Sequence, residues 1–266
     1  MALDRIASEL EEATMDRQMK SFALKPVAGA LIQQGNGKRL RGSLAQQLAV
    51  QILTGELPEG HMFPGEIEYA EQIGISRSAL REAFRTLSAK GLVDSRPKAG
   101  TRVSPRRQWS LLDPDLLAWQ FEAEPSLKFL HDLFELRMIV EPSAAELAAE
   151  RRTEEHVQAM RNALDAMARH GLATEAGRLA DQQFHMIMLE ASRNDAVIAL
   201  ASSIMAAIAW TTIYKQRKRE LPRDPIPDHR ALFDAVAASD PRAARAAMAE
   251  LIRLALIDTE ISLQTD

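Results

Sequence analysis

The sequence predicts a mainly α-helical protein, in which an N-terminal winged helix-turn-helix is followed by an all-α helical bundle. Two patterns indicate this fold. Residues 66–103 contain two short helical runs joined by a glycine turn, then β-prone runs at 92–93 and 101–103. After Pro114 the chain is rich in Ala and Leu at helical spacing, with breaks at Pro, Gly and Asn. With 266 residues, of which 46% are hydrophobic, the chain is long enough to bury the cores of two domains.

Four regions are expected along the chain. They are an N-terminal extension over residues 1–40, a winged helix-turn-helix domain over 41–105, a linker over 106–114 and an all-helical domain over 115–266. Pro and Gly interrupt the second half of the extension, and we therefore expect it to be flexible.

The helix-turn-helix is predicted from the residues that begin and end its helices. An earlier helix is expected over residues 43–53. The run from Glu66 to Ile73 ends at Gly74, and glycine readily adopts the left-handed backbone conformation that closes many helices. Ser76 then occupies an N-cap position, where its hydroxyl accepts a hydrogen bond from a free backbone N–H of the next helix.

The helix after Ser76 carries a basic stripe. Arg77, Arg81 and Arg85 recur every four residues, and therefore share one helix face. Between residues 72 and 107 there are nine Lys or Arg against two acidic residues, a net charge of +7. Such a helix suits the major groove of DNA, with the wing on the phosphate backbone. The simpler alternative is that the arginines only solvate a helix face, but the order of capped helix, turn and wing favours DNA binding.

Charge and composition separate the two halves of the chain. The whole chain has a net charge of −4, whereas residues 1–107 carry +4 and residues 108–266 carry −8. This asymmetry indicates that only the N-terminal half contacts phosphate. The sequence contains no cysteine, which excludes disulfides and thiolate metal sites. No apolar run approaches the ~18–20 residues that span a bilayer, and we expect a soluble, cytoplasmic protein without membrane contact.

Seven helices are predicted after Pro114, near residues 115–122, 126–150, 153–170, 173–192, 195–219, 228–238 and 241–262. An all-α bundle of this size has room for a small-ligand cavity and a dimer surface. Asn194 is interpreted as a C-terminal helix cap, and the basic run KQRKR at 215–219 as a solvated helix end.

Two groups of polar residues in this bundle are candidates for a binding site. Asp181 and His185 lie one helical turn apart, and His229 is near the start of a later helix. Together they suit a divalent metal such as Zn, Ni or Mn, although the same set also suits a metal-free polar pocket. Arg137 and Glu141 are also four residues apart. They form either an ordinary intrahelical ion pair or part of a cavity in which Arg137 binds a carboxylate.

Several stretches resemble the GntR family of transcription regulators. The N-terminal stretches LAQQLAVQILTGELPEGHMFP, SRSALREAF and GLVDSRPKAGTRV resemble its winged-helix domain. ELRMIVEPSAAELAAER, ADQQFHMIML and PDHRALFDAVAASDPRAARAAM resemble the FCD ligand-binding domain of the FadR subfamily. The linker LLDPDLLAWQ resembles that of sugar-acid regulators of the galactonate-operon type.

This resemblance implies a homodimer on a two-fold symmetric operator, and a DNA affinity that changes when a small carboxylate binds. The expected DNA-contacting residues are Ser76, Arg77, Ser78, Arg81, Arg85, Lys98, Gly100 and Thr101. The expected effector-binding residues are Arg137, Glu141, Asp181, His185 and His229, of which Asp181, His185 and His229 are also the expected metal ligands. Two positions depart from the family pattern: Ile67 replaces a frequent arginine, and Leu251 replaces a fourth metal ligand.

The residues therefore predict a ligand-responsive transcription regulator and not an enzyme. We expect a repressor of genes for the catabolism of a sugar acid or another small carboxylate. A fatty-acyl effector is the main alternative, but it would require an apolar tunnel in place of the Asp and His side chains. A metal-dependent hydrolase would leave the basic N-terminal region unexplained, and a purely architectural DNA-binding protein would not need polar residues inside the bundle.

Overall fold

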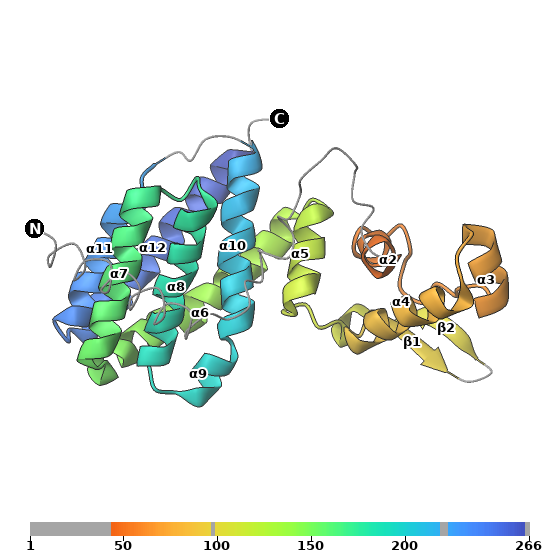
Figure 1. The fold of residues 1–266 in the computed structure, drawn as a ribbon, viewed down its shortest axis with the longest axis horizontal. Helices are drawn as coiled ribbons and strands as arrows, with labels where there is room; N and C mark the ends of the chain where they lie inside the picture. Colours follow the sequence, from red (N-terminus) through yellow and green to blue (C-terminus); the bar gives the residue numbers. More distant parts are fainter. Residues whose placement is uncertain (1–43, 97–98, 219–222, 264–266) are drawn as a thin grey trace, which may run out of the picture. The chain divides into compact units, whose positions relative to one another are not determined.

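The computed structural model describes residues 44–96, 99–218 and 223–263. The extension predicted over residues 1–40 lies outside these ranges, as does Lys98 of the wing tip. The described elements confirm the predicted fold class: a winged helix-turn-helix precedes an all-helical bundle (Figure 1).

The winged-helix part contains three helices and a two-stranded hairpin. These elements are α2 (Leu44–Leu53), α3 (Glu66–Ile73), α4 (Arg77–Ala89), β1 (Val93–Arg96) and β2 (Gly100–Val103). The strands are antiparallel, and Val93 is paired with Val103. Phe84 of α4 is buried and packs edge-on against Phe63, with ring centroids 5.0 Å apart. This core fixes α4 against α2 and the hairpin.

The predicted capping residues form the turn between α3 and α4. Gly74 has a φ of +70°, and its backbone N–H reaches the carbonyl oxygens at the end of α3. The Ser76 hydroxyl accepts a hydrogen bond from the Ala79 backbone N–H at 3.2 Å. These two residues end one helix and begin the next within three positions, and Arg77 becomes the first residue of α4.

The segment after the wing connects α4 to the helical bundle through several close contacts. A short 3₁₀ turn (Arg106–Gln108) approaches Gly91 so closely that an added Cβ would lie 2.0 Å from the Gln108 carbonyl oxygen. The Lys90 ammonium, at the C-terminal end of α4, contacts Asp113 at 2.7 Å and Asp115 at 2.8 Å. The Lys90 side chain is 10% exposed and that of Asp113 28%, whereas Asp115 is 67% exposed. The two ion pairs hold the end of α4 against the start of α5.

The bundle contains eight described helices. They are α5 (Pro114–Glu122), α6 (Leu127–Arg151), α7 (Glu154–His170), α8 (Glu175–Ala191), α9 (Asp195–Ala199), α10 (Ala201–Lys218), α11 (Ile226–Ala237) and α12 (Pro241–Leu263). The single helix predicted over 195–219 was wrong, because the chain forms two helices there. The interpretation of Asn194 as a C-terminal cap was also wrong. Asn194 is the N-cap of α9, and its side-chain oxygen accepts hydrogen bonds from the Ala196 and Val197 backbone N–H groups.

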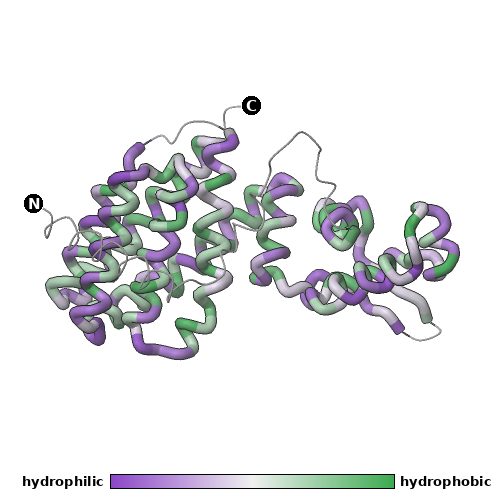
Figure 2. The backbone as a smooth tube through the Cα atoms, viewed as in Figure 1, coloured by the Kyte–Doolittle hydropathy of each residue, from purple (hydrophilic) through white to green (hydrophobic). Residues whose placement is uncertain are grey.

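The core of the bundle lies between α6, α7, α8, α11 and α12. Fully buried side chains include Met160, Phe184, Met188, Leu232 and Met248. Polar and apolar residues alternate along these helices at helical spacing (Figure 2), as one buried face per helix requires. None of the described helices has the length and hydropathy needed to cross a membrane.

Candidate functional site

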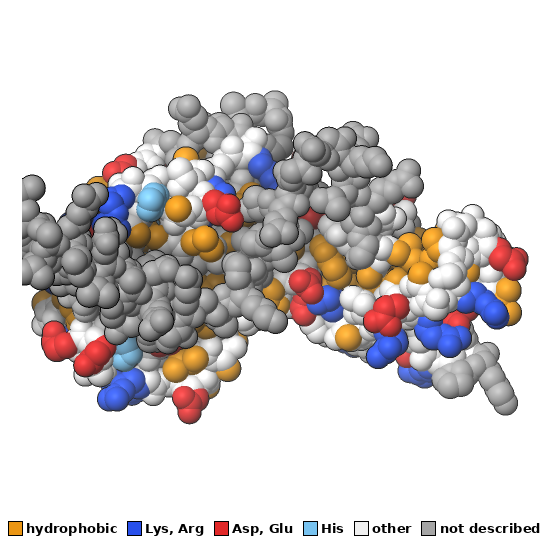
Figure 3. All heavy atoms as spheres, in the orientation of Figure 1, with side chains coloured by type: hydrophobic (Ala, Val, Ile, Leu, Met, Phe, Trp, Pro, Cys, Tyr) orange, Lys and Arg blue, Asp and Glu red, His pale blue; other side chains and the backbone are white. Residues whose placement is uncertain are grey.

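The basic stripe of α4 lies at the surface. The side chains of Arg81 and Arg85 are 68% and 76% exposed. Arg81 forms an ion pair with Glu66 of α3 at 2.9 Å, and Arg85 with Glu82 at 3.1 Å. Exposed pairs of this kind contribute only about 0–1 kcal/mol, so exchanging these carboxylates for DNA phosphates costs little. In Figure 3, Lys and Arg side chains appear on the surface of the winged-helix part among a few acidic ones.

The remaining residues predicted to contact DNA differ in how far their side chains are exposed. Ser76 caps α4, and the hydroxyl of Ser78 lies 3.0 Å from that of Ser76. Gly100 is exposed at the start of β2 with a φ of +81°. Thr101 is only 8% exposed, and its hydroxyl bonds that of Ser95 at 2.8 Å. The Thr101 side chain therefore braces the hairpin and is not presented to solvent, because alternate residues of a strand face opposite sides.

The candidate effector residues converge on a cavity of about 40 Å³ inside the bundle. Four of the five expected residues line it: Arg137 of α6, Asp181 and His185 of α8, and His229 of α11. The fifth, Glu141, is fully buried outside the lining, between Arg137 and His185. Leu251 of α12 lines the same cavity, at the position where the family resemblance implies a further ligand.

Asp181, His185 and His229 form a cluster whose donor atoms lie within 4.8 Å of one another. The Nδ1 of His229 lies 2.9 Å from the Pro225 carbonyl oxygen. Because a carbonyl only accepts, Nδ1 carries the proton, and in the neutral ring Nε2 presents a lone pair. That lone pair lies 3.0 Å from Asp181 Oδ1, and neither atom has a hydrogen-bond partner among the described residues. Two acceptors this close require a cation or a proton between them.

The second histidine is oriented by a buried carboxylate. His185 directs Nε2 toward Asp181 Oδ1 at 3.7 Å and Nδ1 toward Glu141 Oε2 at 3.5 Å. Histidines that bind metals commonly face a carboxylate or carbonyl with their other nitrogen. Both histidines of the cluster have this arrangement, and the three side chains therefore fit a divalent ion.

Both buried carboxylates are ionised at neutral pH. Burial raises the pKa of Glu141, but Arg137 and His185 outweigh it and bring the pKa to about 2. Burial also raises the pKa of Asp181, but a proton shared with His229 and the nearby His185 and Arg137 lower that pKa below its usual range. The cluster thus keeps negative charge inside a low-dielectric interior.

Arg137 forms the intrahelical ion pair and also lies at the cavity, and its binding of an effector carboxylate stays a prediction. Its guanidinium lines the cavity, and it also donates to Glu141 through Nε at 2.6 Å and Nη2 at 3.4 Å. Both side chains are almost fully buried, so this is not an ordinary surface pair. Glu141 thus occupies one edge of the guanidinium, formed by Nε and Nη2.

The sequence did not predict the polar lining residues that α10 and α12 supply. Thr211, Thr212 and Lys215 line it from α10, and Asp258 from α12. Burial lowers the pKa of Lys215 to about 8. The interpretation of residues 215–219 as a solvated helix end was therefore wrong for Lys215. Helical spacing alone predicts which residues share a face, but not which face a neighbouring helix covers.

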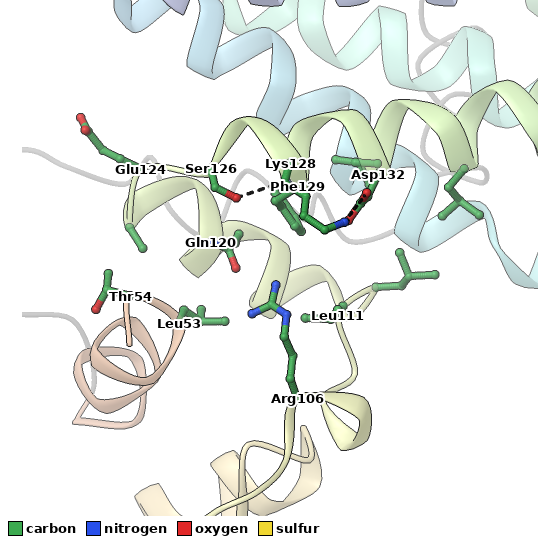
Figure 4. Close-up of a pocket in the computed structure, with 14 residues that line it drawn as sticks. Leu53, Thr54, Arg106, Leu111, Gln120, Glu124, Ser126, Lys128, Phe129 and Asp132 are labelled. Atoms are coloured by element: carbon green, nitrogen blue, oxygen red, sulfur yellow. Dashed lines mark hydrogen bonds and ion pairs between the residues drawn. The ribbon is translucent and has the colours of Figure 1, made fainter. Parts of the chain in front are cut away.

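A larger cavity of about 660 Å³ lies beside α5 and the start of α6 (Figure 4). Its lining is mostly apolar, and its charged side chains are exposed, as in the pair of Lys128 with Asp132 at 2.7 Å. It contains no cluster of buried titratable side chains among its described lining residues. Chemistry rather than volume therefore makes the smaller cavity the candidate effector site.

The fold and the two sites define a DNA-binding transcription regulator with a separate effector-binding bundle. Residues 40–103 match the bacterial regulatory proteins of the gntR family, and residues 132–254 match the FCD domain. The chain belongs to the GntR family, with an FCD domain after its winged helix.

Individual relatives agree with this assignment. The HTH-type transcriptional regulator YieP of Escherichia coli is 35% identical over 221 residues, covering 81% of this chain and 94% of that protein. The galactonate operon transcriptional repressor of Escherichia coli is 32% identical over 207 residues, covering 77% and 90%. The solved structure of Lar from Listeria monocytogenes has a TM-score of 0.57 at 19% identity, covers 85% of this chain and 99% of that chain, and shares the fold.

Proposed function

We propose that this regulator is a cytoplasmic, homodimeric repressor of genes for the catabolism of a sugar acid or a related small carboxylate. Its similarity to the galactonate operon repressor supports the class of effector. We further propose that residues 41–105 bind a two-fold symmetric operator and that residues 115–266 bind the effector and form the dimer. Residues 1–40 and 106–114 then serve as extension and linker.

The observation that carries this proposal is the pair of facing acceptors on Asp181 and His229. A cation held with His185 would account for their 3.0 Å separation, and a proton shared by the two atoms is the alternative that chelation distinguishes. Nitrogen and oxygen donors favour Zn, Ni or Mn. Leu251 offers no ligand atom, so the three protein ligands leave positions for water or an effector oxygen.

The charge inside the cavity links the metal to the acid. The lining residues and their direct ion-pair partners comprise three cations and four anions, a formal charge of −1 with neutral histidines. They are Arg137, Lys215, Arg223, Glu141, Asp181, Asp228 and Asp258. A carboxylate is repelled by this balance, whereas a divalent ion changes the charge to +1. Metal and acid should therefore bind cooperatively.

Entry of the acid requires a change in the bundle. A cavity of about 40 Å³ holds roughly three water molecules at about 10–15 Å³ each, which is less than a sugar acid occupies. Lining side chains must therefore move when the acid binds. This requirement supports an effector that stabilises a different arrangement of helices.

A chain of contacts connects the cavity to α4, the helix that we propose contacts DNA. Helix α10 lines the cavity and packs against α5, and α5 begins at the residues that bind Lys90. The Lys90 ammonium also lies 5.4 Å from the ring centre of Trp119 on α5. We propose that a shift of α10 is passed through α5 and Lys90 to α4, which places Arg77 and Arg81 on the operator bases.

A thermal-shift screen of the purified protein tests this function. Galactonate, other sugar acids, small organic acids and a fatty-acyl ligand are each added with and without EDTA. We expect one small acid to raise the melting temperature and chelation to abolish the rise. A rise in melting temperature that survives EDTA would contradict metal binding but would still support an acid-binding site. Stabilisation by the acyl ligand alone would contradict the small-acid effector.

A further inference from the structure

We propose that Lys215 binds the anionic group of the effector directly, and that the effector is a small hydroxy acid whose hydroxyl groups face Thr212. This inference rests on the proposed function of the cavity as an organic-acid site. It assigns the carboxylate contact to a lysine on α10 and not to Arg137.

Lys215 is a buried cation that no carboxylate among the described residues contacts directly, and Asp258 and Asp181 act on its charge only at longer range. Its side chain lines the cavity from α10, and the residue is 8% exposed. No hydrogen bond or ion pair joins its ammonium to any residue in the part of the chain that the structure describes. A buried ammonium without a partner is strongly unfavourable, and such groups are retained mainly at sites that bind a charged ligand.

The other two cations of the cavity already have carboxylate partners. Arg137 donates two hydrogen bonds to Glu141. Arg223 forms ion pairs with Asp228 and, at 3.0 Å, with Asp258. An incoming carboxylate at either guanidinium would meet a cation whose charge a protein carboxylate already balances. Among the described residues that line the cavity, Lys215 is the cation that no carboxylate contacts directly.

The surroundings of Lys215 indicate the rest of the ligand. Thr212 lies three residues before it on α10, and therefore on the same helix face. Thr212 is buried at 7% exposure and lines the cavity. The neighbouring hydroxyl of Thr211 already donates to the Ala207 carbonyl oxygen at 2.8 Å, which leaves it as an acceptor. A carboxylate on Lys215 would thus place adjacent hydroxyl groups beside threonine oxygens, and a hydroxy acid has these groups.

The test compares metal-loaded wild-type protein with Lys215→Met, Lys215→Arg and the control Lys128→Met. Methionine keeps the length of the side chain without the charge, and Lys128 is 82% exposed and paired with Asp132. Calorimetric titrations measure the affinity for galactonate, for the uncharged galactonolactone and for Zn²⁺. Unfolding of the ligand-free proteins is measured in parallel.

We expect Lys215→Met to lose at least about tenfold in galactonate affinity, the value of one charge-assisted hydrogen bond. Affinities for the lactone and for Zn²⁺ should stay unchanged, and Lys215→Arg should retain part of the galactonate affinity. The ligand-free Lys215→Met protein should melt higher than wild type, because it no longer buries an unpaired charge. Lys128→Met should match wild type throughout.

The outcomes that would contradict this inference can be distinguished from those that would contradict the proposed function. Equal galactonate affinity in wild type and Lys215→Met would overturn the assignment of Lys215 and leave the proposed function intact. A ligand-free Lys215→Met protein that melts lower or loses Zn²⁺ would show that the lysine is structural, which also overturns it. Wild-type protein that binds neither galactonate nor any acid of the screen would overturn the proposed function and this inference together.

Discussion

The buried ion pair between Arg137 and Glu141 gives the most quantitative prediction. Glu141 is fully buried, and Arg137 donates to its carboxylate at 2.6 Å. The substitution Glu141→Gln removes the negative charge but keeps the size of the side chain. The guanidinium of Arg137 then remains buried without a counter-charge, and the free energy of unfolding should fall.

Two estimates of the loss agree. The pKa of Glu141 falls from 4.5 to about 2 on folding, and each unit corresponds to about 1.4 kcal/mol. The ionised carboxylate therefore contributes about 3 kcal/mol to stability above pH 4.5, and this contribution is lost as the pH falls toward 2. Removing one partner of a buried pair independently costs about 3–5 kcal/mol. We expect a loss of about 3 kcal/mol at pH 7.

The assay is urea unfolding at pH 7, followed by circular dichroism. Wild type is compared with Glu141→Gln, Arg137→Met and the double variant. Because the double variant buries no unpaired charge, it should lose much less stability than the sum of the two single variants. The control is Glu250→Gln, which breaks an exposed pair with Arg253 and should cost less than about 1 kcal/mol.

A second readout concerns the metal. Glu141 faces Nδ1 of His185 at 3.5 Å, and loss of such an outer carboxylate lowers metal affinity by about 10–100-fold. The reasoning is refuted if Glu141→Gln unfolds within about 1 kcal/mol of wild type, or if the two single losses simply add.

Three further predictions concern DNA binding by Arg81, the pH dependence of stability and the close approach of Gly91 to Gln108. Arg81→Ala should weaken operator binding at least about tenfold with the fold intact, and unchanged affinity and salt slope in fluorescence anisotropy would refute its role. Burial lowers the pKa of Lys215 to about 8, so the folded protein loses this proton at a lower pH than the unfolded chain. The free energy of unfolding should therefore rise by about 3 kcal/mol between pH 8 and 10.5. Identical pH profiles for wild type and Lys215→Met would disprove this. Gly91→Ala would place a Cβ 2.0 Å from the Gln108 carbonyl oxygen at a φ of +73°, so it should lower stability by about 2 kcal/mol or more. A melting temperature equal to that of wild type would contradict this last prediction.

The helix-turn-helix was predictable because its signals are local. Gly74 and Ser76 determine where α3 ends and α4 begins through backbone conformation and capping, and neither depends on distant residues. The end of α8 was harder, since Asn194 caps equally well at either end of a helix. Its role became clear only from the hydrogen bonds to the start of α9.

The effector site was predictable only in part. Asp181 and His185 share a helix face by spacing, and His229 was grouped with them as a third ligand type, although no spacing relates the two helices. Lys215, Arg223 and Asp258 lie on segments that meet in the cavity only after the helices have packed. Periodicity does not distinguish a buried cation from a solvated one. The burial of Lys215 could therefore not be predicted from the basic run in which it lies.

The central claim is that the Asp181, His185 and His229 cluster controls DNA binding from inside the bundle. The most direct test measures operator affinity of metal-loaded protein with increasing concentrations of the acid selected by the thermal-shift screen. Wild type is compared with His229→Ala and with His131→Ala, whose imidazole is 54% exposed and bonds Glu260. We predict that the acid weakens operator binding at least about tenfold in wild type and His131→Ala, and not at all in His229→Ala, while all three bind the operator equally without acid. A His229→Ala protein that responds to the acid as wild type does would contradict the account.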